Sequence, residues 1–344
     1  MKTGRREFLE TMGVGAAALA VSTMVPKAVA QAAAAGAAGG KRLKMIVRID
    51  DVGYSDVCNI GAFETVAHGV ACSCDTMFDT PGTVDAFERL AKLPWITVGW
   101  HAHFWGTPVL DPKEVPSMVI KEGDRIRFRK DLRTATDLNS DEVLKECRAQ
   151  MDRCVKVLGR APDTGPGEGR GDTPLGKAMA QVCREFGVPM NFASRQSIAK
   201  DGKITFSEVD PKWAGRKLIT LDPGPAYKEL YTDSVTELEK YDPYNYYAEN
   251  RAHLDQIPEG SVVEQSWHPG YVDYYVYRLG DYGPYARNFI PSRTKDVETL
   301  CSARMKTWIK ENRIELVNYR DALYGTNEYQ NHLREIGSDL YMGG

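Results

Sequence analysis

Short apolar runs alternate with amphipathic segments along the chain from Lys44 onward. Runs of this kind are typical of buried strands, and apolar positions spaced three and four residues apart are typical of helices. The pattern predicts strands over 45–49, 71–78, 96–100, 188–192, 218–221, 262–267 and 314–317. It predicts helices over 57–68, 84–92, 141–158, 173–186 and 295–311, with Ser140 as the N-cap of the third and Gly187 ending the fourth. This repeated β-α alternation indicates an α/β fold with a mostly parallel sheet, either open or closed into a barrel.

The N-terminal region has a different composition from the rest. Arg5-Arg6 precedes a weakly apolar run from Thr11 to Val25, and Ala28-Val29-Ala30 offers a cleavage site of the small-x-small type. The arginine pair followed by Phe8-Leu9 is similar to the twin-arginine (Tat) class of bacterial export signals. About 15 apolar residues are too few to cross the ~30 Å core of a bilayer comfortably. We therefore expect passage through the Tat translocon and a periplasmic or extracellular location, with a retained membrane anchor as the alternative.

This organisation divides the chain into four parts. We expect a Tat signal peptide over 1–30, an Ala/Gly-rich linker over 31–42, a single domain over 43–330 and a C-terminal tail over 331–344.

The composition limits the possible classes of protein. Of 344 residues, 42% are hydrophobic and 26% charged, which is typical of a soluble globular protein. Lys and Arg number 44 against 47 Asp and Glu, so the formal charge of −3 provides no basic field for nucleic acid. Seven cysteines do not make a disulfide framework in a chain of this length. Cys147 and Cys154 fall on the apolar face of a predicted helix, and Cys72 and Cys74 alternate as in a strand, so we expect core thiols.

Polar side chains follow several of the predicted strands. Active sites of β/α folds lie at the carboxyl ends of the strands. Asp50-Asp51 follows the first strand, His101 and His103 follow the third, and His268 follows the strand over 262–267. Carboxylates and imidazoles at separate strand ends predict a metal-hydrolase site. Each piece also has an ordinary structural interpretation, such as a solvated turn at the Asp pair or a packed imidazole.

A glycine-rich segment, Asp163-Thr-Gly-Pro-Gly-Glu-Gly-Arg-Gly-Asp172, precedes the helix over 173–186. It lacks the Lys-Ser/Thr of a phosphate-binding P-loop, which argues against nucleotide binding. Its scarcity of side chains lets the backbone come close to a metal or substrate. Glu168 could ligate a cation or face solvent, whereas Arg170 would serve an anionic substrate group or pair with a carboxylate.

Taken in order, three blocks resemble the YdjC-like family of carbohydrate deacetylases, which includes the chitooligosaccharide deacetylases. Arg48-Ile-Asp50-Asp51-Val-Gly53-Tyr-Ser55 resembles the family's opening Asp-Asp-x-Gly-x-Ser. Val98-Gly99-Trp100-His101 is similar to its Gly-x-His segment, and Glu264-Gln-Ser-Trp-His268-Pro269-Gly270 resembles its C-terminal Glu-x-x-x-His-Pro signature. Arg293-x-x-Asp296 is a weaker match.

The resemblance implies a distorted (β/α) barrel of the TIM-like deacetylase type and a divalent metal, either Zn, Mg or Mn. It also implies Asp50 as the base, Asp51 and His101 as metal ligands, and His268 as the acid or orienting group. One departure stands out, because the family usually carries a further metal ligand in a His-rich run where this chain has the glycine-rich segment. Glu168 is the candidate for that ligand, and His103 is the rival.

Aromatic residues near the site histidines indicate where a substrate would bind. Sugar rings stack on aromatic faces, although a Tyr-rich core or an oligomer interface would have the same composition. Residues expected to contact the substrate are His103, Trp105, Arg170, Trp267 and Tyr271. The sequence thus predicts an exported metal-dependent hydrolase that removes N-acetyl groups from an amino sugar or oligosaccharide. The alternatives are a hydrolase of the same barrel for another amide or ester, and a non-catalytic carbohydrate-binding protein.

Overall fold

The computed structural model describes residues 43–167, 171–199, 201–223, 227–228, 230, 241–245, 257–279 and 288–343. The segments expected to be signal peptide and linker, together with Glu168 and Arg170, lie outside the described residues. Within the described part of the chain, we find no helix with both the length and the apolar character needed to cross a bilayer.

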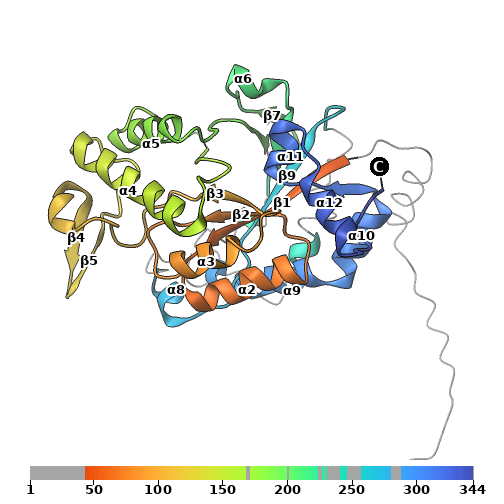
Figure 1. Cartoon of the computed structure of the whole chain (residues 1–344), viewed down its shortest axis with the longest axis horizontal. Helices are drawn as coiled ribbons and strands as arrows, with labels where there is room; N and C mark the ends of the chain where they lie inside the picture. The colour runs from red at the N-terminus through yellow and green to blue at the C-terminus, as the bar shows by residue number, and fades with distance from the viewer. Residues whose placement is uncertain are drawn as a thin grey trace, which may run out of the picture. The chain divides into compact units, whose positions relative to one another are not determined.

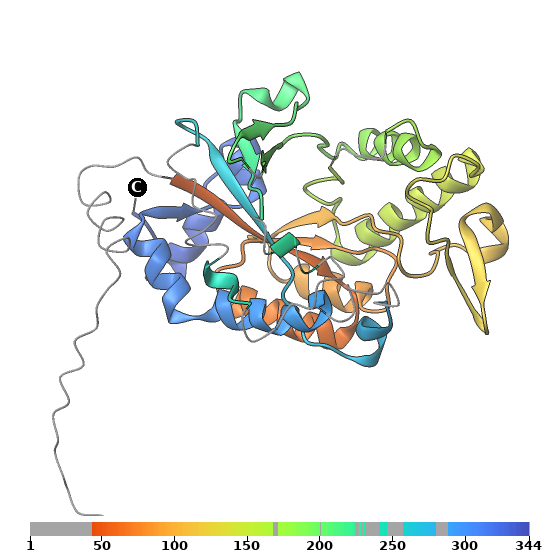
Figure 2. The same cartoon turned by 180° about the vertical axis from the view of Figure 1, so that it is seen from behind.

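A predominantly parallel sheet forms the centre of the domain (Figures 1 and 2). Its strands run in the order β3-β2-β1-β9-β8-β6-β7, and β10 pairs with the first residues of β1. All these pairings are parallel except the β6–β7 hairpin. The strands are β1 (Leu43–Val52), β2 (Ser73–Thr76), β3 (Thr97–Trp100), β6 (Ser194–Ile198), β7 (Ile204–Phe206), β8 (Leu218–Thr220), β9 (Val262–Trp267) and β10 (Ile314–Leu316).

Strand β1 is central because its apolar run is buried completely. Met45, Ile46 and Val47 have no exposed surface, as is typical of a parallel strand covered on both faces. On one edge β1 pairs with β9, and Ile49 lies opposite Trp267. The next residues along the two strands are Asp50 and His268. The register therefore brings these two polar residues to the same edge of the sheet.

Helices cover the sheet, and α2 and α9 pack side by side below it in the view of Figure 1. Helices α10, α11 and α12 lie at the opposite end from α4, and the β4–β5 hairpin projects beyond α4 (Figure 2). The helices are α2 (Asp56–Ala67), α3 (Thr83–Leu90), α4 (Ser140–Leu158), α5 (Pro174–Glu185), α6 (Pro211–Ala214), α8 (Tyr274–Leu279), α9 (Ile290–Cys301), α10 (Ala303–Glu311), α11 (Tyr319–Tyr324) and α12 (Glu328–Glu335). Smaller elements are the 3-10 turns η1 (Pro112–Glu114) and η2 (Pro116–Met118) and the strands β4 (Val119–Glu122) and β5 (Arg125–Phe128).

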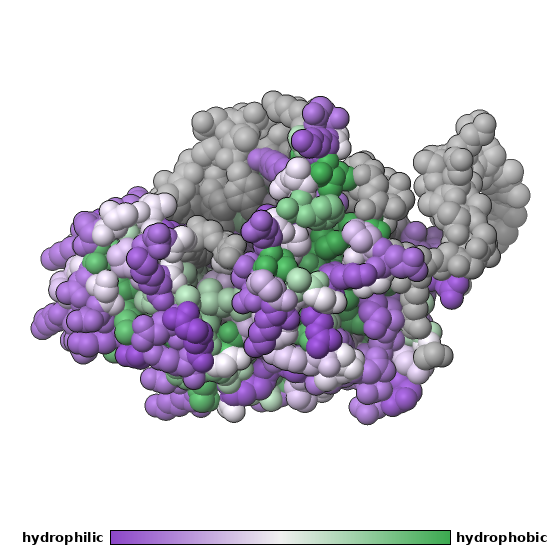
Figure 3. Space-filling view, turned by 90° about the horizontal axis from the view of Figure 1, so that it is seen from above, coloured by the Kyte–Doolittle hydropathy of each residue, from purple (hydrophilic) through white to green (hydrophobic). Residues whose placement is uncertain are grey.

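The core is one large cluster of apolar side chains from the sheet and the helices around it. The six cysteines at 58, 72, 74, 147, 154 and 183 are buried and form no disulfide, which confirms Cys72, Cys74, Cys147 and Cys154 as core thiols. The face seen in Figure 3 is mainly hydrophilic where it is described, with hydrophobic residues gathered near the centre of the view.

The structure confirms the parallel sheet and most of the predicted elements, and β9 has the predicted bounds. The strand predicted over 188–192 is wrong, and β6 begins at Ser194 instead. Two features explain this error. Pro189 has no N–H to donate to a neighbouring strand, and Asn191 has a φ of +49°, outside the strand region.

Helix boundaries differ from the prediction in two places. The helix predicted over 295–311 is two helices, because Ser302 is extended and its side chain caps α10 by accepting from the N–H of Met305. Helix α4 is capped by Asn139 rather than Ser140, since the Asn139 side chain accepts from the N–H groups of Asp141 and Glu142. Position 330, where we expected the domain to end, lies within α12.

The pairings among the described strands do not close into a barrel. Two contacts continue the strand path beyond β3. Gly99 forms a parallel bridge with Thr164, and the N–H of Gly165 donates to the carbonyl of Pro189 at 2.8 Å. The distorted barrel therefore stays a prediction, whereas the α/β class with a parallel sheet is observed.

Candidate active site

Asp50 and Asp51 end β1 where its pairing with β2 becomes irregular. The register shifts between Ile49 and Val52, and Asp51 has a φ of +62°. Consecutive residues of a regular strand point to opposite faces, whereas a bulge re-aims a side chain. This irregularity allows both carboxylates to face one site.

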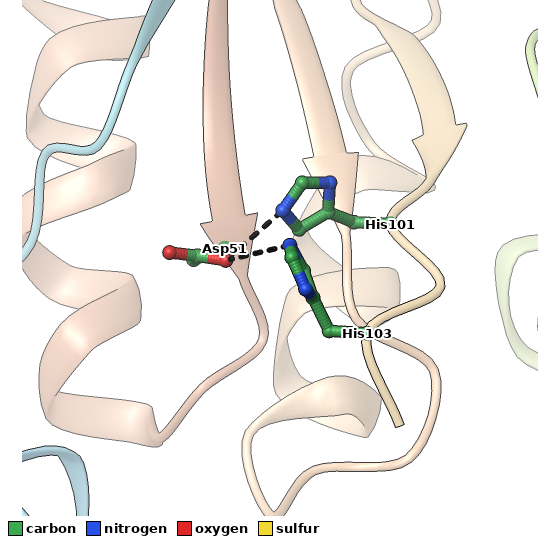
Figure 4. Close-up of side chains that lie close together, drawn as sticks. All are labelled: Asp51, His101 and His103. Atoms are coloured by element: carbon green, nitrogen blue, oxygen red, sulfur yellow. Dashed lines mark ion pairs between the residues drawn. The ribbon is translucent and has the colours of Figure 1, made fainter. Parts of the chain in front are cut away.

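His101 and His103 follow β3 in a tight turn rather than in a strand. The N–H of Ala102 donates to the carbonyl of Trp100 at 3.1 Å, and that of His103 donates to the carbonyl of His101 at 2.8 Å. Their rings lie 4.2 Å apart at an angle of 71°. The turn brings both imidazoles toward Asp51 (Figure 4).

The three side chains converge at one carboxylate oxygen. Asp51 Oδ1 lies 3.0 Å from His101 Nε2 and 4.0 Å from His103 Nε2. Among the described residues, neither Asp51 Oδ1 nor His101 Nε2 has a hydrogen-bond partner, although both are buried. Unsatisfied buried polar atoms are costly, and a cation among the three ligand atoms would satisfy them. A carboxylate with two imidazoles is a donor set that suits zinc, manganese or iron.

The other oxygen of Asp51 is held by Arg293. The Arg293 guanidinium on α9 is fully buried, pairs with Asp51 Oδ2, and lies over the rings of Tyr54 and Phe289 at 4.9 and 5.0 Å. Burial alone would raise the pKa of Asp51, but Arg293 and His101 outweigh it and hold that pKa well below its usual value. Asp51 is therefore an anion, with one oxygen neutralised and the other turned toward the histidines.

Asp50 has a different partner. Arg48 Nε and Nη2 donate to its two oxygens at 2.6 and 2.8 Å. The same guanidinium lies 2.7 Å from Glu264 Oε1 and 3.5 Å from Asp75 Oδ2. Burial, partly offset by Arg48, raises the pKa of Asp50 to about 6. Asp50 is therefore a stronger base than an ordinary carboxylate.

His268 ends β9 beside Asp50. Its backbone N–H donates to Asp296 Oδ2 at 2.9 Å, and its ring Nδ1 lies 2.6 Å from the Tyr227 hydroxyl. Nε2 lies 3.8 Å from Asp50 Oδ2. Burial, reinforced by Arg293, lowers the pKa of His268 to about 3. The imidazole is therefore neutral near pH 7 and has a single N–H to donate.

The structure brings five of the predicted site residues together, namely Asp50, Asp51, His101, His103 and His268. Trp105 also lies at the site, stacked on His103 with ring centroids 4.2 Å apart, and Tyr271 is 38% exposed.

Trp267 does not fit the predicted role in substrate contact. Its ring is 0% exposed, packs in the core and donates to Gln265 Oε1. A place at the end of a strand did not predict substrate contact for Trp267, because the side chain of a strand's last residue can still face the core.

Other residues of the site escaped the sequence analysis. Asp75 on β2 lies with Oδ2 3.8 Å from His101 Nδ1, and Arg48 binds Asp50 from two positions earlier on the same strand. A charged residue inside an apolar strand was the available signal for Arg48. Arg293 and Asp296, three apart on α9, were noted only as a weak motif, yet they contact Asp51 and His268.

An α/β domain with an Asp-His centre at the carboxyl edge of a parallel sheet belongs to a class in which metal-dependent hydrolases are common. The sequence model of the family described as YdjC-like protein matches residues 44–311, so the chain belongs to the YdjC-like family.

Two relatives match along nearly their whole length. The chain is 24% identical over 290 residues to carbohydrate deacetylase 2 of Listeria innocua, covering 81% of this chain and 98% of that protein. It is 27% identical over 286 residues to the carbohydrate deacetylase of Enterococcus faecalis, covering 80% and 97%. A crystal structure from Enterococcus faecalis V583, titled as a candidate cellobiose-phosphate cleavage protein, superposes with a TM-score of 0.56 at 22% identity. That comparison covers 82% of this chain and 100% of the other, and it supports the fold.

Proposed function

We propose that this protein is a metal-dependent deacetylase that hydrolyses the acetamide of an N-acetylated amino sugar or oligosaccharide. The observation that carries the proposal is the convergence of Asp51, His101 and His103 on unsatisfied buried atoms, next to the basic carboxylate of Asp50. The names of the two carbohydrate deacetylases support the substrate class. A distorted barrel is part of the proposal, supported by the contacts that extend the strand path beyond β3.

Asp51, His101 and His103 would hold the divalent ion. When bound, such an ion supplies Lewis acidity, which makes water nucleophilic near pH 7 and stabilises negative charge on an acyl oxygen. Because Arg293 occupies Asp51 Oδ2, the site offers one oxygen and two nitrogens, a set that favours zinc, iron or manganese over magnesium.

Asp50 is the base of the proposed reaction. Arg48 contacts both its oxygens and fixes the plane of the carboxylate, while each oxygen keeps a lone pair for a water proton. With a pKa of about 6, Asp50 is ionised at neutral pH and still accepts a proton readily.

The departing amine needs a proton when the C–N bond breaks. Two groups can supply it: the proton that Asp50 has taken from water and the N–H of the neutral His268 ring, 3.8 Å away. His268 acts in this scheme as a hydrogen-bond donor that orients the leaving nitrogen, and Asp50 returns the proton. This favours the orienting role for His268 over that of a protonated acid.

The proposal includes export by the Tat route and contacts between the sugar and the aromatic rings of Trp105 and Tyr271. The export part is supported by Arg5-Arg6 and Ala28-Val29-Ala30. Replacing both arginines with lysine should leave unprocessed protein in the cytoplasm. Mature protein outside the cytoplasm in that variant would refute this part.

The catalytic part is tested on the purified protein by metal analysis and by acetate release from N-acetylated chitooligosaccharides. We expect a stoichiometric divalent ion and acetate release, both lost in His101→Ala. His68→Ala is the matched control, because His68 is exposed and follows α2 away from the site. Bound metal without acetate release from any N-acetylated sugar would reject the substrate class and keep the metal site.

A further inference from the structure

Arg133 contacts one of the proposed metal ligands. It lies in the turn that follows β5, its side chain is exposed, and its Nη1 is 3.0 Å from His103 Nδ1. Within the part of the chain that the structure describes, Arg133 forms no ion pair with a carboxylate. The imidazole of His103 is therefore the partner that the described residues give this guanidinium.

The chemistry of the two groups fixes the direction of the hydrogen bond. A guanidinium has only N–H donors, so Nδ1 of His103 must accept through its lone pair. A neutral imidazole has one N–H and one lone pair, so its proton must lie on Nε2. Nε2 is the atom that faces Asp51 Oδ1, at 4.0 Å.

A cation bound to His103 needs a lone pair on the coordinating nitrogen. Coordination through Nε2 requires the proton to move to Nδ1, which would then face the Arg133 N–H as a second donor. Coordination through Nδ1 would place the cation where the guanidinium now lies. Either way, the Arg133 contact and coordination by His103 exclude each other.

The ring nitrogens of His101 face carboxylates instead of a guanidinium. Its Nδ1 faces a carboxylate oxygen of Asp75, at 3.8 Å, and its Nε2 faces Asp51 Oδ1. Without a metal, the nearer carboxylate of Asp51 favours the proton on Nε2. When Nε2 binds a cation, the proton can move to Nδ1, where the Asp75 carboxylate can accept it, as in many carboxylate–histidine–metal arrangements. His101 can therefore coordinate a cation without losing a partner, whereas His103 in the same turn cannot.

We propose that Arg133 is a positioning residue that holds the proton of His103 on Nε2, an arrangement that we call the latch. A divalent cation then binds Asp51 and His101 first, and it completes its coordination with His103 only by displacing Arg133. The inference rests on the proposed metal site. It makes Arg133 a residue that weakens metal binding and sets the order in which the ligands engage. The displaced guanidinium would then lie at the exposed rim of the site.

The test is a double-mutant cycle with Zn²⁺ alone, measured by competition with a chromophoric chelator. The four proteins are wild type, Arg133→Gln, His103→Ala and the double variant. We expect Arg133→Gln to tighten Zn²⁺ binding by about tenfold when His103 is present, in the range known for groups that orient a ligand. In the His103→Ala background the same change should leave the affinity nearly unaltered.

Comparing Arg133→Gln with and without His103 separates the latch from a general electrostatic effect of Arg133 on the cation. Loss of a positive charge near a cation tightens binding whether or not His103 is present, so equal tightening in both backgrounds would overturn the latch and keep the metal site. Weaker binding in Arg133→Gln would overturn it too. If no variant binds Zn²⁺, the proposed metal site fails, and the latch with it.

A second measurement needs no metal. Nitrogen-15 NMR of the metal-free protein should find the His103 proton on Nε2, and Arg133→Gln should remove this preference without changing the His101 signals. A His103 proton on Nδ1 in the wild-type protein would refute the latch directly. Arg133 is exposed, so the variant should fold, which circular dichroism checks.

Discussion

Two neighbouring aspartates at the end of β1 lie in contrasting surroundings. Asp51 faces a buried arginine, Arg293, and its pKa lies well below the usual value. Asp50 faces Arg48, a guanidinium that also contacts Glu264 and Asp75. Its pKa is raised to about 6.

The contrast teaches that the pKa of a buried carboxylate depends on all the charged groups around it and not on its nearest arginine alone. Both aspartates are almost completely buried, so desolvation raises both pKa values. For Asp50, the Arg48 guanidinium that it shares with Glu264 and Asp75 offsets this rise only in part, whereas for Asp51 Arg293 and His101 together outweigh it. One residue becomes a permanent anion suited to binding a metal, and the next becomes a base.

The largest effects should come from neutralising each aspartate. Asp51→Asn removes an anionic ligand, so Zn²⁺ affinity should fall by about 100-fold or more. Asp50→Asn should keep the metal and lower kcat by roughly 10²–10⁴-fold, the range for losing a general base. His268→Ala should resemble Asp50→Asn. Metal titration and acetate release measure these outcomes, and equal metal loss in both aspartate variants would abolish the contrast.

Removing Arg293 should destabilise the fold. Arg293→Met leaves a buried carboxylate without its partner, at a cost of about 3–5 kcal/mol in the free energy of unfolding. Zn²⁺ should then raise the Tm of this variant more than that of the wild type, because the cation replaces the lost charge. Arg148→Met is the control, since its pair with Glu185 is on the surface and should leave denaturant unfolding unchanged. An equal Tm rise in both proteins would argue against a charge effect.

A smaller loss of stability is expected from a substitution at Gly99, which packs against Asp75. A Cβ at Gly99 would lie 2.0 Å from Asp75 Oδ1 and 2.8 Å from Thr164 Oγ1, so Gly99→Ala must displace that carboxylate. We expect a loss of about 1–3 kcal/mol in unfolding free energy. Gly215→Ala is the matched control, because a Cβ there meets no atom within 4 Å and its φ is negative. Equal stability of the two variants would show that Asp75 is not held against β3.

The smallest effect concerns the sharing of Arg48 among Asp50, Glu264 and Asp75. Asp50 must be ionised to act as a base, so activity should fall as pH drops through about 6. Glu264→Gln removes one of the carboxylates that pair with Arg48, and with it a negative charge near Asp50. Both changes should lower the pKa of Asp50. The acid limb of kcat/KM should therefore move to lower pH, by up to about one unit. Glu259→Gln, exposed at the other end of β9, should not move it, and a shift upward in Glu264→Gln would contradict the sharing argument.

The sequence predicted most of the scaffold, because apolar runs and strand ends are local features. It placed Asp50, Asp51, His101 and His268 at strand ends, and the parallel pairing brings them together. It could not reveal that Arg293 and Asp75 face the site, since such contacts depend on how distant helices and strands pack. Nor could it reveal the bulge at Asp51 or the turn at His101, which arise from backbone angles without a residue signature here.

The packing of Trp267 was also beyond local patterns. A tryptophan beside a site histidine has the same sequence context whether its ring faces a sugar or the core. Only the orientation of β9 against its neighbouring strands distinguishes the two, and here the ring faces the core.

The ion pair between Asp51 and Arg293 joins residues 242 positions apart. Ribosomes add about 5–20 residues per second, so roughly 12 to 48 s separate the synthesis of the aspartate from that of its arginine. Throughout that interval Asp51 has no Arg293 to face, and a carboxylate without its partner favours water over the interior. A nascent chain that stops before α9 therefore lacks the formed centre, and the proposed metal would bind there only after α9 has been synthesised.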